Sequence, residues 1–129
     1  MCKIIYLVTV GTGTAGWKSN VAEGIMAAIR FRKPDYTVLI PSKSEKSTAV
    51  AEIVREGLHE FSFLPDYPLS NWDKLLQCKE EITNLIDRIR NEFQGHSIVI
   101  NPTSGTKQMT TAAVLAAIDA EIGNIEYIT

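Results

Sequence analysis

Apolar and polar residues follow one another along this chain in blocks that predict alternating strands and helices. Residues 3–10 and 97–100 are rich in Ile, Val and other apolar types, and in these runs apolar residues do not alternate with polar ones. Such runs are typical of strands that are covered on both faces, as in a parallel sheet between helices. A third strand is predicted at 36–40 and a short last strand at 125–128, while the two prolines in 62–69 allow only a short or edge strand there.

Helical spacing of apolar residues appears in four intervening stretches. They are 19–32, 49–61, 72–93 and 110–118, with 72–93 the most clearly amphipathic, and the residues at 42–47 read as a polar loop. Strands and helices therefore alternate about five times. This order predicts an α/β, Rossmann-like, mainly parallel sheet of about five strands with helices on both faces and right-handed crossovers.

Two turns of small residues follow predicted buried strands. GTGTAG, at 11–16, comes directly after Val10, and TSGT, at 103–106, comes after Pro102. In open α/β sheets, ligands bind outside the carboxyl ends of the strands, where the strand order reverses. If the first strand and the strand at 97–100 lie side by side, these two turns form one site.

The second turn has the chemistry of an anion site. Thr103, Ser104 and Thr106 supply hydroxyls, and free N–H groups at a helix N-terminus favour a negative ligand. Lys107 adds a positive charge where the helix dipole disfavours one unless an anion is bound, which points to a phosphate. In the alternative interpretation, the same small residues only cap the helix and Lys107 extends into solvent.

Several better-known nucleotide and hydrolase sites fit poorly. The first turn matches G-x-G-x-x-G, but the residues after Ile40 supply no acid for a ribose, so a classical dehydrogenase is not expected. A P-loop needs Lys directly after its second Gly, where this chain has Trp17, so magnesium-dependent NTP hydrolysis has little support. Neither His59 nor His96 can be assigned to a nucleophilic triad, and no general base is evident.

Composition and charge limit the class of protein to which this site can belong. The chain of 129 residues suits one domain, and 45% hydrophobic with 22% charged residues is typical of a globular protein. A net charge of −2 argues against general nucleic-acid binding. Cys2 and Cys78 lack metal-ligand spacing, no secretory signal precedes them, and no apolar run reaches the roughly 20 residues of a membrane span. We expect a cytoplasmic protein without a metal, a cofactor or a membrane partner.

The second turn carries a family resemblance. NPTSGTK, at 101–107, resembles the ligand-binding motif of the CARF family, the CRISPR-associated Rossmann fold, which reads Asn or Asp, any residue, Ser or Thr, three residues, then Arg or Lys. Asn101, Thr103 and Lys107 occupy the three defined positions. The loop at 10–14 is similar to the other ligand-binding loop of this family, and the resemblance covers essentially the whole chain.

The resemblance implies a homodimer whose two-fold axis passes through a pocket for a cyclic oligoadenylate, the second messenger of type III CRISPR immunity. Cyclic tetra-adenylate is favoured as the ligand and cyclic hexa-adenylate is the alternative. Lys107 is the first choice for a phosphate contact. Carried over position by position, the ligand-binding residues are Val10, Gly11, Thr12, Gly13, Asn101, Thr103, Ser104, Gly105, Thr106 and Lys107.

Some CARF members also cut their ligand as metal-independent ring nucleases, in which a ribose 2′-hydroxyl attacks the adjacent phosphorus. The resemblance then implies catalytic roles for Lys107 with Thr12 or Thr14, although binding alone would use the same residues. Most members join the sensor to an effector domain. We therefore expect residues 1–129 to be a single CARF-like domain, either free-standing or the N-terminal sensor part of a longer protein.

Two further functions stay open at this stage. One is a generic Rossmann module that binds a nucleotide or dinucleotide, for which GTGTAG is the main evidence. The other is a purely structural dimerisation domain, in which residues 103–107 only cap a helix.

Overall fold

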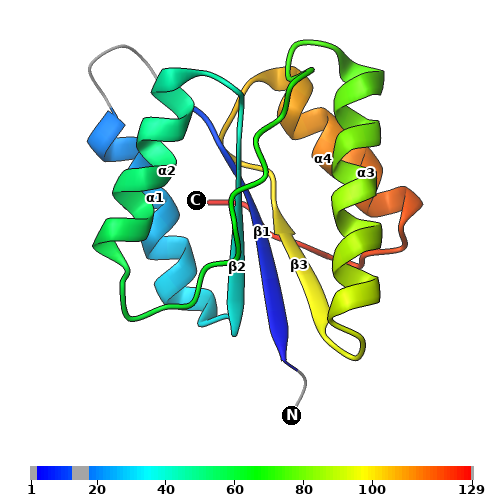
Figure 1. The fold of residues 1–129 in the computed structure, drawn as a ribbon, viewed down its shortest axis with the longest axis horizontal. Helices are drawn as coiled ribbons and strands as arrows, with labels where there is room; N and C mark the ends of the chain where they lie inside the picture. Colours follow the sequence, from blue (N-terminus) through cyan, green and yellow to red (C-terminus); the bar gives the residue numbers. More distant parts are fainter. Residues whose placement is uncertain (1–2, 13–17, 129) are drawn as a thin grey trace.

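A computed structural model of the chain describes residues 3–12 and 18–128. Its parallel sheet has the strand order β2-β1-β3-β4, and the helices form one layer on each face of the sheet (Figure 1). The α/β, Rossmann-like fold predicted from the sequence is confirmed. The strands are β1 (Ile4–Val10), β2 (Tyr36–Pro41), β3 (Ser97–Asn101) and β4 (Asn124–Ile125). Helices α1 (Lys18–Arg32) and α2 (Glu45–Gly57) lie on one face, and α3 (Leu75–Glu92) and α4 (Lys107–Asp119) lie on the other.

The strands are apolar on both faces because each face packs against helices. Successive side chains of a strand point to opposite sides of the sheet. Ile5 and Leu7 of β1 belong to the core beneath α3 and α4, whereas Tyr6 and Val8 belong to the core beneath α1 and α2. All four side chains are fully buried. This double cover explains why the sequence lacks polar alternation at these positions.

The sheet has four strands where the sequence predicted about five. The stretch 62–69 runs beside β2, where the Thr37 N–H donates to the Ser62 carbonyl at 3.1 Å and the Leu64 N–H donates to the Thr37 carbonyl at 2.9 Å. It forms only isolated bridges, because Pro65 and Pro68 have no N–H to donate to a continuous ladder. The predicted edge position of this stretch is therefore confirmed.

Helix starts differ from the sequence predictions. Helix α2 begins at Glu45, within the predicted loop, because the Ser44 side chain accepts a hydrogen bond from the Ser47 N–H and caps the helix. Helix α3 begins at Leu75 rather than at Trp72, and the Leu76 side chain is 72% exposed instead of lying on the buried stripe. None of the described helices is long and apolar enough to cross a membrane.

The strand order places the two small-residue turns together. β1 pairs with β2 on one side and with β3 on the other, so the order reverses at β1. In the β1 to β3 register, Val8 lies opposite Asn101. The carboxyl ends of these two strands are therefore neighbours, which is the arrangement that one shared site requires.

Candidate ligand-binding site

The turns that follow β1 and β3 touch through their backbones. The Gly11 N–H donates a hydrogen bond to Ser104 Oγ at 2.8 Å. A Cβ atom at Gly11 would lie 2.6 Å from the Gly105 nitrogen and 2.7 Å from its Cα, so no other residue fits without moving the loop. Gly105 itself has a φ of 130°, a conformation that favours glycine. Two glycines thus allow the turns to meet.

Helix α4 starts at the edge of this contact. Thr106 is its N-cap, and the Thr106 hydroxyl oxygen accepts a hydrogen bond from the Met109 N–H at 3.1 Å. The same hydroxyl donates to the Trp72 carbonyl at 3.3 Å, which ties the start of α4 to the segment before α3. Lys107 is the first residue of the helix, and it is exposed.

A cleft of about 440 Å³ opens over this arrangement at the carboxyl ends of the strands. Its wall combines both predicted turns with the start of α2 and the segment before α3, and the described lining contains no Asp or Glu. The lining residues are Gly11, Thr12, Ser42, Ser44, Trp72, Gly105, Thr106 and Met109.

Serines at the start of α2 hold the cleft together, and sequence reasoning did not identify them. Ser47 is fully buried; its hydroxyl donates to the Val10 carbonyl at 2.7 Å and accepts from the Ser42 N–H at 2.9 Å. Ser42 and Ser44 share a hydrogen bond between their hydroxyls at 3.0 Å. The available signal was three serines within six residues directly after a strand at the same sheet edge.

The Asn101 side chain holds the second turn through hydrogen bonds to Thr103. Its amide nitrogen donates to the Tyr6 hydroxyl at 2.9 Å. Its side-chain oxygen accepts from the Thr103 N–H at 3.1 Å and from the Thr103 hydroxyl at 2.7 Å. The Thr103 hydroxyl oxygen in turn accepts from the Ile128 N–H at 2.7 Å. The motif asparagine and threonine therefore bond to each other, to Tyr6 of β1 and to the segment after β4.

The hydrogen-bond network beneath Asn101 continues away from the cleft. The Tyr6 hydroxyl donates to Glu126 Oε1 at 3.1 Å, and the Glu126 carboxylate forms an ion pair with Arg32. Burial raises the pKa of the Tyr6 phenol, and the hydrogen bond from Asn101 opposes part of this rise. Tyr6 therefore stays protonated at neutral pH and remains a hydrogen-bond donor.

The structure brings most of the predicted site residues to one place, in different roles. Gly11, Thr12, Gly105 and Thr106 line the cleft. Val10 is buried, and its carbonyl accepts a hydrogen bond from Ser47. Asn101 and Thr103 bond to each other, and Ser104 joins the two turns. Lys107 is exposed beside Thr106. Gly13 and Thr14 lie outside the described residues.

Comparison with known proteins finds similarity at the level of structure alone. No protein-family model and no curated protein sequence matches this chain. Csm6 from Enterococcus italicus, solved bound to cyclic hexa-2′-fluoro-hexa-dAMP, superposes with a TM-score of 0.73 at 17% identity, over 98% of this chain and 33% of that one. Protein VC1899 from Vibrio cholerae superposes with a TM-score of 0.70 at 8% identity, over 98% of this chain and 30% of that one. LpCGTa in complex with UDP reaches a TM-score of 0.50 at 14% identity, over 100% of this chain and 31% of that one.

These identities are low, so the likeness concerns the fold. The chain has a Rossmann-like fold, and the likeness to Csm6 extends over nearly its whole length. It spans about a third of the length of each of the three solved chains.

Proposed function

We propose that this chain binds a cyclic oligoadenylate in the cleft at the carboxyl ends of β1 and β3. The observation that carries the proposal is the direct contact of the two predicted ligand loops, with the Gly11 N–H on Ser104 Oγ at 2.8 Å, beneath one cleft. The ligand class is supported by Csm6, a protein of the same fold that was solved with a cyclic hexanucleotide analogue.

The charges around the cleft suit phosphates. The chain has a net charge of −2, yet the described lining of the cleft contains no acid. The start of α4 contributes free N–H groups and the positive end of the helix dipole, both of which favour an anion. Lys107, exposed at the first position of this helix, adds a full positive charge and is the proposed phosphate contact.

The size of the cleft supports a shared site. Small-molecule sites measure roughly 300 to 1,000 Å³; at about 440 Å³, one cleft suits part of a cyclic oligonucleotide rather than a whole ring. A ring with internal symmetry can be held by two copies related by a two-fold axis, each of which contributes the same loops. The proposed working form is a cytoplasmic homodimer that prefers cyclic tetra-adenylate, with cyclic hexa-adenylate as the alternative ligand.

The proposal extends to cleavage of the bound ring. A ribose 2′-oxygen would bond to the adjacent phosphorus, the bond from phosphorus to the 5′-oxygen would break, and the 2′-hydroxyl proton would leave to solvent while the 5′-oxygen takes one up. The protein would align this attack and stabilise charge on the phosphate oxygens. Lys107, Thr12 and Thr14 are the proposed catalytic residues, of which Thr14 lies outside the described residues.

Binding of cyclic tetra-adenylate and cyclic hexa-adenylate, measured by calorimetry, tests the proposal. Hydrogen bonds to charged groups contribute about 1.5 to 3 kcal/mol, so Lys107→Ala should weaken binding roughly 10- to 100-fold. Lys3→Ala, an exposed lysine at the opposite end of β1, is the matched control and should bind like the wild type. Chromatography of the nucleotide after incubation without metal then separates a sensor, which leaves the ring intact, from a ring nuclease. Failure of the wild type to bind either ring would refute the proposal.

The second candidate is a module that binds a single nucleotide. The G-x-G turn after β1 and the similarity to LpCGTa, solved with UDP at a TM-score of 0.50, favour it. Titration with UDP and with oxidised and reduced nicotinamide cofactors distinguishes the two candidates. Saturable binding of one of these, without binding of either ring, would select the second.

A further inference from the structure

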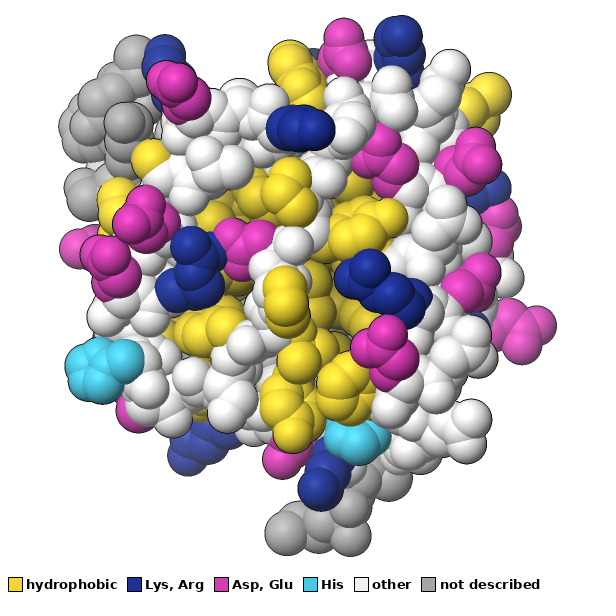
Figure 2. Space-filling view, in the orientation of Figure 1, with side chains coloured by type: hydrophobic (Ala, Val, Ile, Leu, Met, Phe, Trp, Pro, Cys, Tyr) yellow, Lys and Arg dark blue, Asp and Glu magenta, His cyan; other side chains and the backbone are white. Residues whose placement is uncertain are grey.

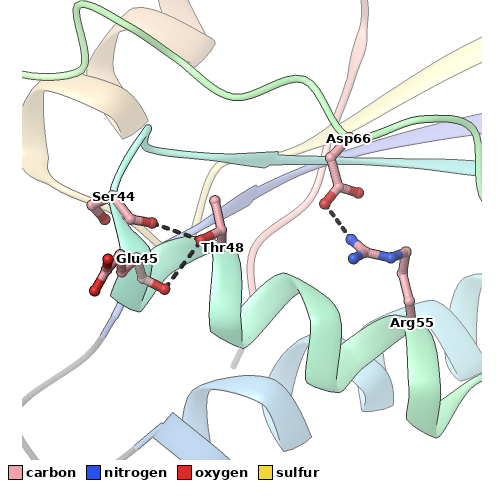
Figure 3. Close-up of polar contacts among 5 residues, drawn as sticks. All are labelled: Ser44, Glu45, Thr48, Arg55 and Asp66. Atoms are coloured by element: carbon pink, nitrogen blue, oxygen red, sulfur yellow. Dashed lines mark hydrogen bonds and ion pairs between the residues drawn. The ribbon is translucent and has the colours of Figure 1, made fainter.

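The segment between α2 and α3 runs along β2 to the carboxyl end of the sheet, where it turns into α3 (Figure 1). Figure 2 shows apolar side chains along the middle of this face, with Lys or Arg and Asp or Glu side chains on both sides. An ion pair between Asp66 and Arg55 ties the segment to α2 (Figure 3), and Leu64 and Tyr67 pack against the core. Cover of the sheet edge explains these residues but not Trp72, which follows them in the chain and lines the cleft.

Hydrogen bonds from two helices fix the turn that carries Trp72. The Glu81 carboxylate of α3 accepts hydrogen bonds from the Ser70 N–H at 3.0 Å, the Asn71 N–H at 3.1 Å and the Asn71 side-chain nitrogen at 2.9 Å. The Trp72 carbonyl accepts a hydrogen bond from the hydroxyl of Thr106, the N-cap of α4. The backbone of Trp72 is therefore held in place before any ligand binds.

The end of β2 holds the residue that precedes this turn. The Leu69 N–H donates to the Pro41 carbonyl at 2.8 Å, and the Leu69 carbonyl accepts from the Lys43 N–H at 3.0 Å. Ser42 stands between these two partners in the chain and forms a bridge with Leu69. Ser42 and Trp72 both line the cleft, so this pairing links two parts of its wall.

The cleft wall has an apolar part. Trp72 and Met109 are the two large apolar side chains in its described lining, and the other residues there are Gly, Ser and Thr. Met109 is buried and lies against Gly105, where an added Cβ atom would meet Met109 Cε at 3.2 Å. Trp72 packs against the core beneath α3 and α4 but is only partly buried. Core packing thus accounts for part of the indole and leaves an aromatic surface at the cleft.

The hydroxyls of Ser42 and Ser44 keep one hydrogen-bond donor for a ligand. They share one hydrogen bond at 3.0 Å, and the Ser44 oxygen also accepts from the Ser47 N–H at 3.3 Å. A single bond between two hydroxyls uses one of their two protons, and among the described residues the other proton has no acceptor. Since hydroxyl oxygens also accept, the pair offers both a donor and an acceptor, and the edge of an adenine base carries one of each.

We propose that Trp72, Ser42 and Ser44 form a base subsite, in which an adenine of the bound ring stacks on the indole and its edge bonds to the two hydroxyls. The inference rests on the proposed function, and it adds a role for the part of the cleft that the phosphate contacts at α4 leave unused. Nucleobases stack favourably on aromatic side chains. A side chain whose backbone is already fixed also costs less ordering when the ligand binds.

Two variants of Trp72 separate the aromatic ring from its apolar bulk. Trp72→Leu and Trp72→Phe both keep an apolar side chain against the core, but only Phe keeps a ring. Trp72→Leu should bind cyclic tetra-adenylate or cyclic hexa-adenylate roughly 5- to 150-fold more weakly, the range for loss of one stacked base, and Trp72→Phe should bind more tightly than Trp72→Leu. Phe31→Leu is the control, because it removes an 83% exposed ring outside the described lining of the cleft and should bind like the wild type.

Free AMP and ribose 5-phosphate test the base subsite without a cyclic ligand and in the wild-type chain, so this readout holds even where a variant fails to fold. Both compounds carry a ribose with a 5′-phosphate, but only AMP carries a base. Nuclear magnetic resonance follows the indole N–H signal of Trp72, which Trp72→Phe identifies among the two tryptophans of the chain. AMP at millimolar concentration should shift this signal, and ribose 5-phosphate should leave it unchanged.

The outcomes distinguish the base subsite from the proposed function. Equal ring binding by the wild type and a folded Trp72→Leu, with binding weakened in Lys107→Ala, would overturn the base subsite and leave the proposed function in place. A shift with AMP but not with ribose 5-phosphate, in a chain that binds neither ring, would support the base subsite and refute the proposed function. An indole signal that AMP leaves unchanged, or that both compounds shift equally, would overturn the base subsite.

Discussion

At the scale of single residues, Gly11 is a position where both the fold and the candidate site depend on the absence of a Cβ atom. A methyl group there would lie 2.6 Å from the Gly105 nitrogen, which is backbone and cannot rotate away. We expect Gly11→Ala to lower the free energy of unfolding by about 1 to 3 kcal/mol, the usual cost of overpacking, and to weaken ligand binding as well. Urea denaturation measures the first effect.

Gly123→Ala is the matched control for this change. A Cβ atom at Gly123 would meet no atom within 4 Å. Its free energy of unfolding should therefore stay close to that of the wild type. Equal losses in the two variants would show that the close approach of the loops has no energetic importance.

Cys78 predicts a dependence of stability on pH. Its side chain is fully buried, and burial, assisted by Glu81, raises the pKa of the thiol to about 11. The unfolded thiol loses its proton near pH 8.5, so the unfolded state binds fewer protons above that pH and stability falls until the folded thiol also titrates. Between pH 8 and 10.5, the stability of the wild type relative to Cys78→Ala should fall by about 2 kcal/mol, measured by urea denaturation. A constant difference would contradict the assigned environment of the thiol.

At the scale of elements, Ser47 links the start of α2 to the ends of β1 and β2. Its buried hydroxyl donates to the Val10 carbonyl and accepts from the Ser42 N–H. Ser47→Ala leaves both groups without this partner, and a buried unsatisfied group costs about 1 to 3 kcal/mol, so we expect a loss in that range or above it by chemical denaturation.

Thr48→Ala provides the comparison for Ser47. The Thr48 hydroxyl donates to the carbonyls of Ser44, the N-cap of its helix, and Glu45, the first residue of the helix (Figure 3). Because this change removes no link between elements, the stability should change by less than about 0.5 kcal/mol, the usual range for surface positions. A Thr48→Ala loss as large as that of Ser47→Ala would contradict the linking role.

The strands and helices could largely be predicted from the sequence. Strands that are buried on both faces, such as β1 and β3, are continuous apolar runs, which can be recognised without knowing which elements pack against them. The start of α2 could not be predicted, because Ser44 reads equally well as a loop residue and as a cap. The exposure of Leu76 could not be predicted either, since the buried residues of α3 begin at Cys78 and only tertiary packing decides where this burial starts.

The residues of the candidate site could be predicted where the position requires one residue type. Gly11 and Gly105 stand in turns after buried strands, where a close approach or a positive φ calls for glycine, and the structure shows both conditions. Ser47 was not predictable, because serine is common near helix starts and only tertiary packing brings its hydroxyl to the Val10 carbonyl.

At the scale of the whole molecule, the strand order decides where the candidate site forms. The order reverses at β1, so the turns after β1 and β3 meet at one edge of the sheet. This edge holds a cleft beside the start of α4, and the described lining of the cleft contains no Asp or Glu. The arrangement predicts an anionic ligand.

The central claim is that a cyclic oligoadenylate occupies the cleft, and the most direct test is a titration of the isotopically labelled chain followed by nuclear magnetic resonance. Addition of cyclic tetra-adenylate or cyclic hexa-adenylate should shift the backbone amide signals of Gly11, Gly105, Thr106 and Lys107, with little change at Ile125 and Tyr127. No shift with either ring, or shifts centred away from these loops, would contradict the claim.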